Sequence, residues 1–215
     1  MIDLHTHTLL SDGELLPTEL ARRAQEKGYK VIGMTDHVDS SNIDFVIPRI
    51  INACNDINKN WKIKAIPGVE ITHMPIELIK STAKFVRSKG IKLILGHGET
   101  IVEPVIKGTN KEALLADISI LAHPGLITLE DAKLAASRNI YLEITTRKGH
   151  SLSNGHVAKM ARLAGAKLVI STDSHAPENL ITKDFAEEVL FGAGLDKKEI
   201  AQVFKNSEEL VARLT

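Results

Sequence analysis

The sequence has few of the residues that form cross-links, stacking surfaces or a charged face. Cys54 is the only cysteine among 215 residues, which excludes an intrachain disulfide and any zinc site built from several cysteines. Aromatic residues make up 4% of the chain, too few for a platform on which nucleotide bases stack. The 27 Lys and Arg residues balance 27 Asp and Glu residues. Bulk charge therefore favours neither long nucleic acid nor an anionic membrane as a partner.

Long hydrophobic runs are also missing. No apolar stretch approaches the roughly 20 residues that a membrane-spanning helix needs, and the N-terminus has no signal-peptide pattern. Hydrophobic residues still make up 43% of the chain, enough for a substantial buried core. We therefore expect a soluble, cytoplasmic protein with no membrane partner. The oligomeric state does not follow from the sequence.

Short β-branched segments alternate with segments of helical period along most of the chain. Strands are expected at Ile2–Thr6, Lys30–Thr35, Lys64–Val69, Lys92–Leu95, Ile118–Ala122, Tyr141–Thr145 and Lys167–Thr172. Helices are expected at Thr18–Lys27, Phe45–Asn58, Ile76–Ser88, Lys111–Asp117, Leu129–Ser137 and Ser153–Ala164, and from Asp184 onward. The strands start at intervals of roughly 22–34 residues, which is typical of βα units that build a parallel sheet.

Seven such units predict an α/β fold in which the strands close into a (β/α)-barrel of TIM-like type. A doubly wound open sheet has the same rhythm, and the pattern alone leaves it open. No linker, low-complexity segment or longer repeat divides the chain. We expect a single domain over residues 1–215, with the barrel in about 1–180 and C-terminal helices in about 184–214.

Polar residues concentrate where the expected strands end. Six of the nine histidines fall within a residue or two of a C-terminal strand end, together with three carboxylates; these residues are His5, His7, Asp12, His37, Glu70, His97, His123, Asp173 and His175. In a parallel barrel those ends gather at one mouth, where catalytic groups of this fold collect. Imidazoles and carboxylates that converge in one pocket would repel one another or lack solvation, unless cations bind among them. The donor types predict divalent metal, Zn²⁺, Mn²⁺ or Fe²⁺.

The competing interpretation is that these residues are structural. A single histidine at a strand end is more often a hydrogen-bonded core or surface residue, and His5-Thr6-His7 alone is only moderately specific. Nine ligand-type residues spread over six strands in one register favour the metal site. His5 and His7 are two positions apart and so share a face of the strand, as do Asp173 and His175.

The ordered blocks DLHTHT, SDG, TDH, PGVE, GHGE, AHPG and STDSH resemble the PHP (polymerase and histidinol phosphatase) family. The resemblance covers residues 1–175 or so. It implies a distorted (β/α)₇ barrel, a PHP-type metallohydrolase domain, and hydrolysis of phosphoesters at a trinuclear metal cluster. The first metal would be held by His5, His7, Glu70 and Asp173, the second by Glu70 as a bridge with His97 and His123, and the third by Asp12, His37 and His175. Asp12 stands where some members have histidine, and its charge favours a harder ion such as Mn²⁺.

The implied chemistry is attack by metal-activated hydroxide on a dianionic phosphate monoester. Glu70, Asp173 and His97 would form its catalytic centre. Glu99 and His73 are candidate proton donors for the leaving group, and metal-bound water is another.

Substrate-binding residues are expected in and after the strand Tyr141–Thr145. Strand alternation sends Glu143, Thr145 and Arg147 inward, and the Arg147 guanidinium is a candidate clamp for phosphate oxygens. A solvated loop cation is the alternative for Arg147. Further candidates for the same mouth are Lys148, His150, Asn154 and His73, each of which alone is also typical of a solvated loop or turn. Residues 99–110 are expected to form a loop over the mouth.

The leading functional hypothesis is hydrolysis of a small phosphate monoester in the style of histidinol phosphatase. A nucleotide phosphatase or a 3′–5′ exonuclease-type phosphodiesterase shares the chemistry, although the charge and the few aromatics disfavour long nucleic acid. A non-catalytic metal-binding regulatory module is a different class, which the nine competent ligands disfavour. An amidohydrolase-like enzyme is disfavoured because no lysine stands at a matching strand end.

Overall fold

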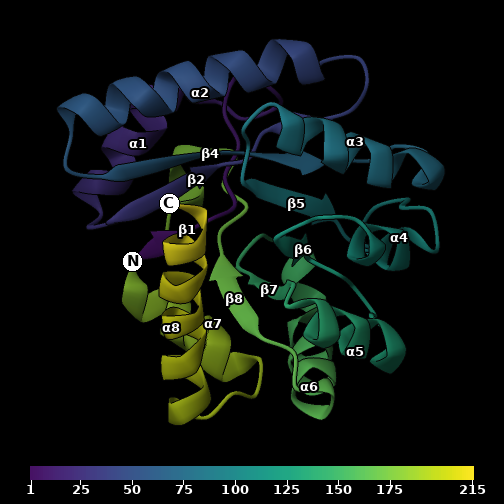
Figure 1. Cartoon of the computed structure of the whole chain (residues 1–215). Coiled ribbons are helices and arrows are strands. Elements are labelled where there is room, and N and C mark those ends of the chain that lie inside the picture. The colour runs from purple at the N-terminus through teal and green to yellow at the C-terminus, as the bar shows by residue number, and fades with distance from the viewer.

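Parallel strands and surrounding helices alternate in the computed structural model, which describes all residues 1–215 (Figure 1). The strands are β1 (Ile2–Asp3), β2 (Val31–Met34), β3 (His37–Val38), β4 (Lys64–Ile71), β5 (Leu93–His97), β6 (Ile120–Ala122), β7 (Tyr141–Thr145) and β8 (Leu168–Ser171). The helices are α1 (Pro17–Glu26), α2 (Ile43–Asn60), α3 (Ile76–Ser88), α4 (Thr109–Leu115), α5 (Leu129–Arg138), α6 (Asn154–Ala164), α7 (Lys183–Gly192) and α8 (Lys197–Leu214). Two short 3₁₀ helices, η1 (His150–Ser153) and η2 (Pro177–Asn179), lie in loops at the strand ends.

The sheet runs in the order β1-β2-β4-β5-β6-β7-β8, and β3 pairs with the end of β4. Every pairing is parallel. The two outer strands meet through a bridge between Thr6 and Ser174, supported by backbone hydrogen bonds from His7 to Ser174 (2.8 Å) and from Asp173 to His5 (2.9 Å). The expected TIM-like barrel is therefore confirmed, and the open doubly wound sheet is excluded.

The barrel interior is apolar at one end and polar at the other. Leu93, Leu95 and Ile120 belong to a buried cluster between the strands, and Leu210 of α8 packs into the same cluster where the strands begin. Gly33 leaves room for the Leu93 side chain of this cluster, because a Cβ at position 33 would lie 2.7 Å from Cδ2 of Leu93. A larger apolar cluster fills the space between the strands and the helices. The opposite end, at which the strands finish, is left to polar side chains.

The first strand differs most from the expected Ile2–Thr6. Regular pairing with β2 ends at Asp3, and the chain pairs again only at Thr6. Strict alternation would place Leu4 and His5 on opposite faces. Leu4 nevertheless belongs to the inner apolar cluster while His5 contacts Glu143 across the barrel. The interruption in pairing lets both side chains face inward.

The other expected elements agree with the structure to within two residues at each end. Strand β3 was not expected, because two residues carry no measurable periodicity. The helical C-terminal segment is divided into α7 and α8 near Gly194, whose φ of 86° is a conformation that glycine tolerates. None of the helices combines the length and the apolar composition that a membrane crossing requires.

Candidate metal centre

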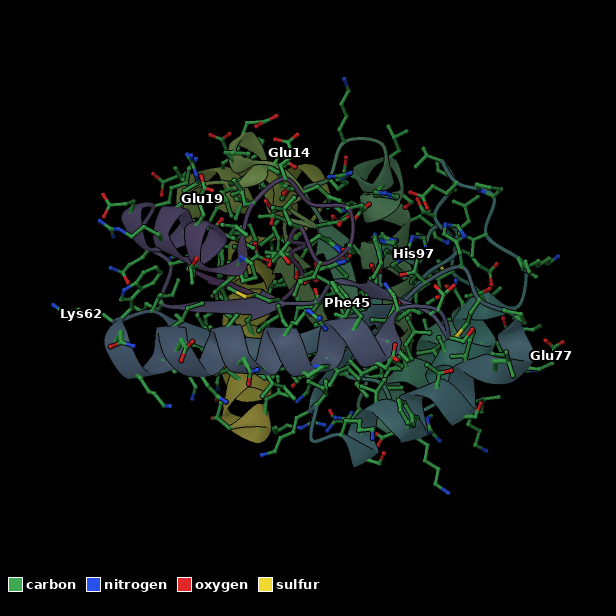
Figure 2. All side chains as sticks on the ribbon, turned by 90° about the horizontal axis from the view of Figure 1, so that it is seen from above. Glu14, Glu19, Phe45, Lys62, Glu77 and His97 are labelled. Carbon is green, nitrogen blue, oxygen red and sulfur yellow. The ribbon has the colours of Figure 1, made fainter.

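A polar cavity of about 470 Å³ lies at the C-terminal ends of the strands. Among the residues that line it, Val38 alone is hydrophobic. Figure 2 looks down on the molecule: His97, one of the lining residues, lies within the outline of the ribbon, whereas Lys62 and Glu77 project from opposite ends. Such a cavity suits a charged ligand and not an apolar one.

The structure brings all nine residues of the expected ligand set together. Their nitrogen and oxygen atoms form overlapping groups within 4.8 Å: His7, Asp12, His37 and His175; His5, His123 and Asp173; His5, His7 and Glu70; and Glu70, His97 and His123. The residues come from β3, β4 and β5 and from the loops that follow β1, β6 and β8. Only closure of the barrel places strands so distant in sequence around one point.

The centre of the group is fully buried. Nε2 of His5 lies 3.0 Å from Nε2 of His7 and 3.3 Å from Oε2 of Glu70. Nε2 of His7 lies 3.1 Å from Oδ1 of Asp173. The other oxygen of Glu70, Oε1, lies 3.4 Å from Nε2 of His123. Glu70 thus offers one oxygen to each of two neighbouring groups, as a bridging carboxylate must.

A more exposed group lies at the rim. Oδ1 of Asp12 is 3.2 Å from Nε2 of His175 and 3.6 Å from Nε2 of His37. Nδ1 of His7 approaches the same oxygen at 3.9 Å, which links the rim to the buried centre. The side chain of Asp12 is 56% exposed, so this group borders solvent.

Several imidazoles are oriented through Nδ1. The Nδ1 atoms of His5, His97 and His175 lie 2.8 Å from Oε1 of Glu143, 3.1 Å from the Gly98 carbonyl and 2.9 Å from the Asp173 carbonyl. Because each partner is an acceptor, Nδ1 carries the proton and Nε2 keeps its lone pair. This is the tautomer that a metal ligand needs. Strand alternation points Glu143 inward, yet nothing in the sequence shows which side chain it meets.

Burial and neighbouring charges shift the pKa values of the buried ligand-type residues in opposite directions. Burial alone would raise the pKa of Glu70, but the neighbouring His5, His37 and His97 hold it well below its ordinary value. Burial would lower the pKa of His5, but Glu143, Glu70 and Asp173 raise it well above its ordinary value. Burial together with the nearby positive charge of His37 lowers the pKa of His7 to about 3.

The residues fit divalent cations. Buried atoms without a hydrogen-bond partner include both carboxylate oxygens of Glu70, Oδ1 of Asp173, Nε2 of His123 and Nδ1 of His7. An unpartnered buried polar atom is costly, and proteins seldom leave several together. Imidazole nitrogen and carboxylate oxygen are donors that Zn²⁺, Mn²⁺ and Fe²⁺ accept. Cations among these side chains would satisfy the unpartnered atoms at once.

The backbone around the centre is strained. His123 and Asp173 have φ values of 26° and 51°, which side chains other than glycine seldom adopt. Strain of this kind gathers at functional sites. Gly98, next to His97, meets a separate demand: a Cβ there would lie 2.2 Å from the Ala122 carbonyl oxygen.

The expected substrate-binding residues divide into two sets. Arg147, His73 and His150 line the cavity. Lys148 is exposed and lies outside the lining. The side-chain amide of Asn154 is used by the backbone of Thr145, accepting from its N–H (3.2 Å) and donating to its carbonyl (2.8 Å).

Glu99, a candidate proton donor, also lies outside the lining. Its Oε1 accepts hydrogen bonds from the backbone N–H groups of Gly108 and Asn110, both at 2.9 Å. Glu99 therefore holds the ends of the loop between β5 and α4 together. This role follows from the loop conformation, which local sequence does not reveal.

Glu103 is one of several cavity residues without a role in the sequence analysis. Glu103 reaches from that loop to three imidazoles, with its oxygens 3.0 Å from Nε2 of His73, 3.1 Å from Nε2 of His97 and 3.3 Å from Nε2 of His150. The expectation of a loop over the mouth was the only signal, and a lone acid in a loop has no periodicity to mark it.

Comparison with known proteins gives one family and several relatives. The family profile described as PHP domain matches residues 3–117. An uncharacterized protein of Methanocaldococcus jannaschii, MJ1295, is 45% identical over 99% of each chain. A probable phosphatase of Shewanella loihica is 26% identical, over 88% of this chain and 84% of its own.

Solved structures share the fold at low identity. A chain in the structure of archaeal ribonuclease P with mature tRNA has a TM-score of 0.76 at 18% identity, over 100% of this chain and 91% of its own. Histidinol phosphate phosphatase from Lactococcus lactis, solved with zinc, L-histidinol and phosphate, has a TM-score of 0.64 at 18% identity, over 91% and 94%. Likeness at this identity shows the barrel fold alone.

Proposed function

The chain belongs to the PHP domain family, and on this premise we propose that it is a metal-dependent phosphatase that hydrolyses a small phosphate monoester. One observation carries the proposal: the polar cavity is lined by His123 and Asp173, which have buried ligand atoms without a hydrogen-bond partner, and the unpartnered carboxylate of Glu70 lies directly behind them, 3.4 Å from His123. The probable phosphatase of Shewanella loihica supports the reaction class, and the histidinol phosphate phosphatase of Lactococcus lactis shows that the same barrel fold can hold zinc and phosphate.

We assign three cation positions to the nine ligands. His5, His7, Glu70 and Asp173 would hold the first, Glu70 with His97 and His123 the second, and Asp12, His37 and His175 the third. Cations there would supply Lewis acidity, which offsets phosphate charge and lowers the pKa of an attacking water. Zinc, manganese and iron(II) all remain compatible with this donor set.

Arg147 is our candidate for holding the phosphate. Its side chain is 30% exposed at the cavity, and Nη1 lies 3.3 Å from the Asp173 carbonyl and 3.4 Å from Oδ1 of Asn179. These contacts use one of the three guanidinium nitrogens, so the others can donate to phosphate oxygens. The contact with Asp173 fixes the guanidinium directly beside the metal ligands, where the scissile group must lie.

The cavity favours a small substrate. A volume of about 470 Å³ is in the range of small-molecule sites. Leaving-group protonation falls to His73 or to water, because Glu99 is committed to the loop backbone. No Phe, Tyr or Trp stands among the residues that line the cavity, which argues against a polynucleotide substrate.

The test combines elemental analysis of the purified protein with a phosphate-release screen over small monoesters, nucleotides and a phosphodiester, with Mn²⁺ or Zn²⁺ added. We expect bound divalent metal and release from small monoesters. Metal binding without release from any monoester would refute the proposed reaction. Absence of metal after reloading would refute the site itself.

A further inference from the structure

The loop between β5 and α4, residues 99–108, closes one side of the cavity; we call it the arm. Its ends are joined because Glu99 accepts hydrogen bonds from Gly108 and Asn110. Oγ1 of Thr100 also lies 2.6 Å from Nδ1 of His150, which anchors the start of the loop to η1. Both ends of the arm are therefore held in place by hydrogen bonds.

The middle of the arm is loosely packed. Ile101, Val102 and Ile106 are 49%, 47% and 57% exposed, so little apolar area holds the arm down. A cavity of about 140 Å³ remains between residues 104–106 and side chains of β4 and α3, among them Ile71 and Ile79. The polar contacts of Glu103 are therefore the main attachment of the arm to the site.

Glu103 occupies a position built for an anion. Three Nε2 atoms converge on its two oxygens within 3.3 Å, and the hydrogen bonds from His150 and His97 hold its pKa below the ordinary value. His73 and His150 belong to none of the three proposed metal sites, so their contacts remain when a cation takes His97. Nε2 of His150 and Nε of Arg147 also lie 3.9 Å and 4.0 Å from the same oxygen of Asp173.

We propose that His73, His150 and Arg147 form an oxyanion subsite beside the metal ligands, and that Glu103 occupies this subsite until a phosphate group displaces it. The inference rests on the proposed function and adds the position of the ligand to it. Carboxylate and phosphate accept hydrogen bonds from the same donors, and a phosphate dianion carries more charge and more acceptor atoms than a carboxylate. The subsite therefore selects tetrahedral oxyanions over singly charged ligands, and the arm opens when one binds.

When the Glu103 carboxylate occupies the subsite, phosphate cannot bind there. Removing the carboxylate therefore lowers the apparent dissociation constant of phosphate in proportion to the fraction of time for which the subsite had been free. If the carboxylate occupies the subsite for about 90% of the time, the apparent dissociation constant falls about 10-fold in its absence. Glu103→Ala removes both the charge and the contacts. Glu103→Gln removes the charge and keeps the size, so we expect it to tighten phosphate binding by a smaller factor.

The experiment is calorimetric titration of inorganic phosphate into the metal-loaded protein, with metal content measured on the same samples. Asp39→Asn is the matched control, because Asp39 lines the same cavity but its carboxylate binds only Ser41. We expect about 10-fold tighter phosphate binding in Glu103→Ala, less than a twofold change in Asp39→Asn, and equal metal content in all variants.

Two results would overturn the subsite. Unchanged or weaker phosphate binding in Glu103→Ala would show that the carboxylate does not compete for it, and a loss of bound metal would show that Glu103 is a metal ligand instead. Tighter phosphate binding in a protein that releases phosphate from no monoester would support the subsite and refute the proposed reaction, so the two failures are distinguishable.

Discussion

Oε1 of Glu143 lies 2.8 Å from Nδ1 of His5, and Oε2 of the same carboxylate accepts the backbone N–H of His123 at 2.8 Å. One fully buried side chain thus orients a ligand of the first proposed metal site and holds the strained backbone of a ligand of the second. Glu143 therefore connects the first two proposed cation positions, although it belongs to neither ligand set.

We expect Glu143→Gln to weaken metal binding about 10- to 100-fold, because an amide cannot accept from both His5 and His123. Competition with a chelator of known affinity measures the effect. Glu77→Gln, on an exposed face of α3, serves as the control and should bind metal as the wild type does. Equal affinity in Glu143→Gln would remove the orienting role.

Asp173→Asn should lose more than about 100-fold in kcat for phosphate release, since it changes a proposed ligand and not merely a residue that orients one. The substitution preserves shape, so the circular dichroism spectrum should not change. Asp56→Asn, exposed on α2, is the control. Near-normal turnover in Asp173→Asn would show that the first proposed site is not catalytic.

Arg147→Ala should raise KM by about 10-fold with little change in metal content, because it removes a charged donor to phosphate and no ligand. The neighbouring Lys148→Ala should change KM less than about twofold, since Lys148 is exposed and lies outside the cavity lining. If Lys148→Ala had the larger effect, the clamp would have been assigned to the wrong cation.

Cys54 provides a pH-dependent prediction away from the site. Burial, and then the charge of Asp36, raise the pKa of its thiol to about 12, whereas the exposed thiol of the unfolded chain ionises near 9. The folded state thus keeps a proton that the unfolded state loses, and stability contributed by Cys54 is complete below pH 9 and falls as pH rises toward 12. Each pH unit in that window costs up to about 1.4 kcal/mol.

Two measurements check this. A thiol reagent at pH 8 should label Cys54 only after unfolding. The free energy of unfolding of wild type relative to Cys54→Ala should be constant up to pH 9 and then fall. Rapid labelling of the native protein, or a constant difference up to pH 11, would contradict the burial of this thiol.

Much of the fold follows from the sequence because its elements repeat. Apolar segments of strand length and helices with period 3.6 recur often enough to predict seven βα units and their boundaries. Features without a periodic pattern were not predicted. Strand β3 has only two residues, and the break in β1 after Asp3 depends on pairing with β2 and β8. Side chains from distant loops, such as Glu103, were missed for the same reason.

The sequence by itself determined the repeated βα units and the nine ligand-type residues, since strand alternation and strand ends are local properties of the chain. Tertiary structure alone decided which of the polar residues meet. It placed Glu143 against His5 and Glu103 against His73, and it turned Glu99 and Asn154 toward backbone groups and away from the cavity. Contacts between residues far apart in sequence depend on barrel closure and loop conformation, and neither leaves a periodic trace in the chain.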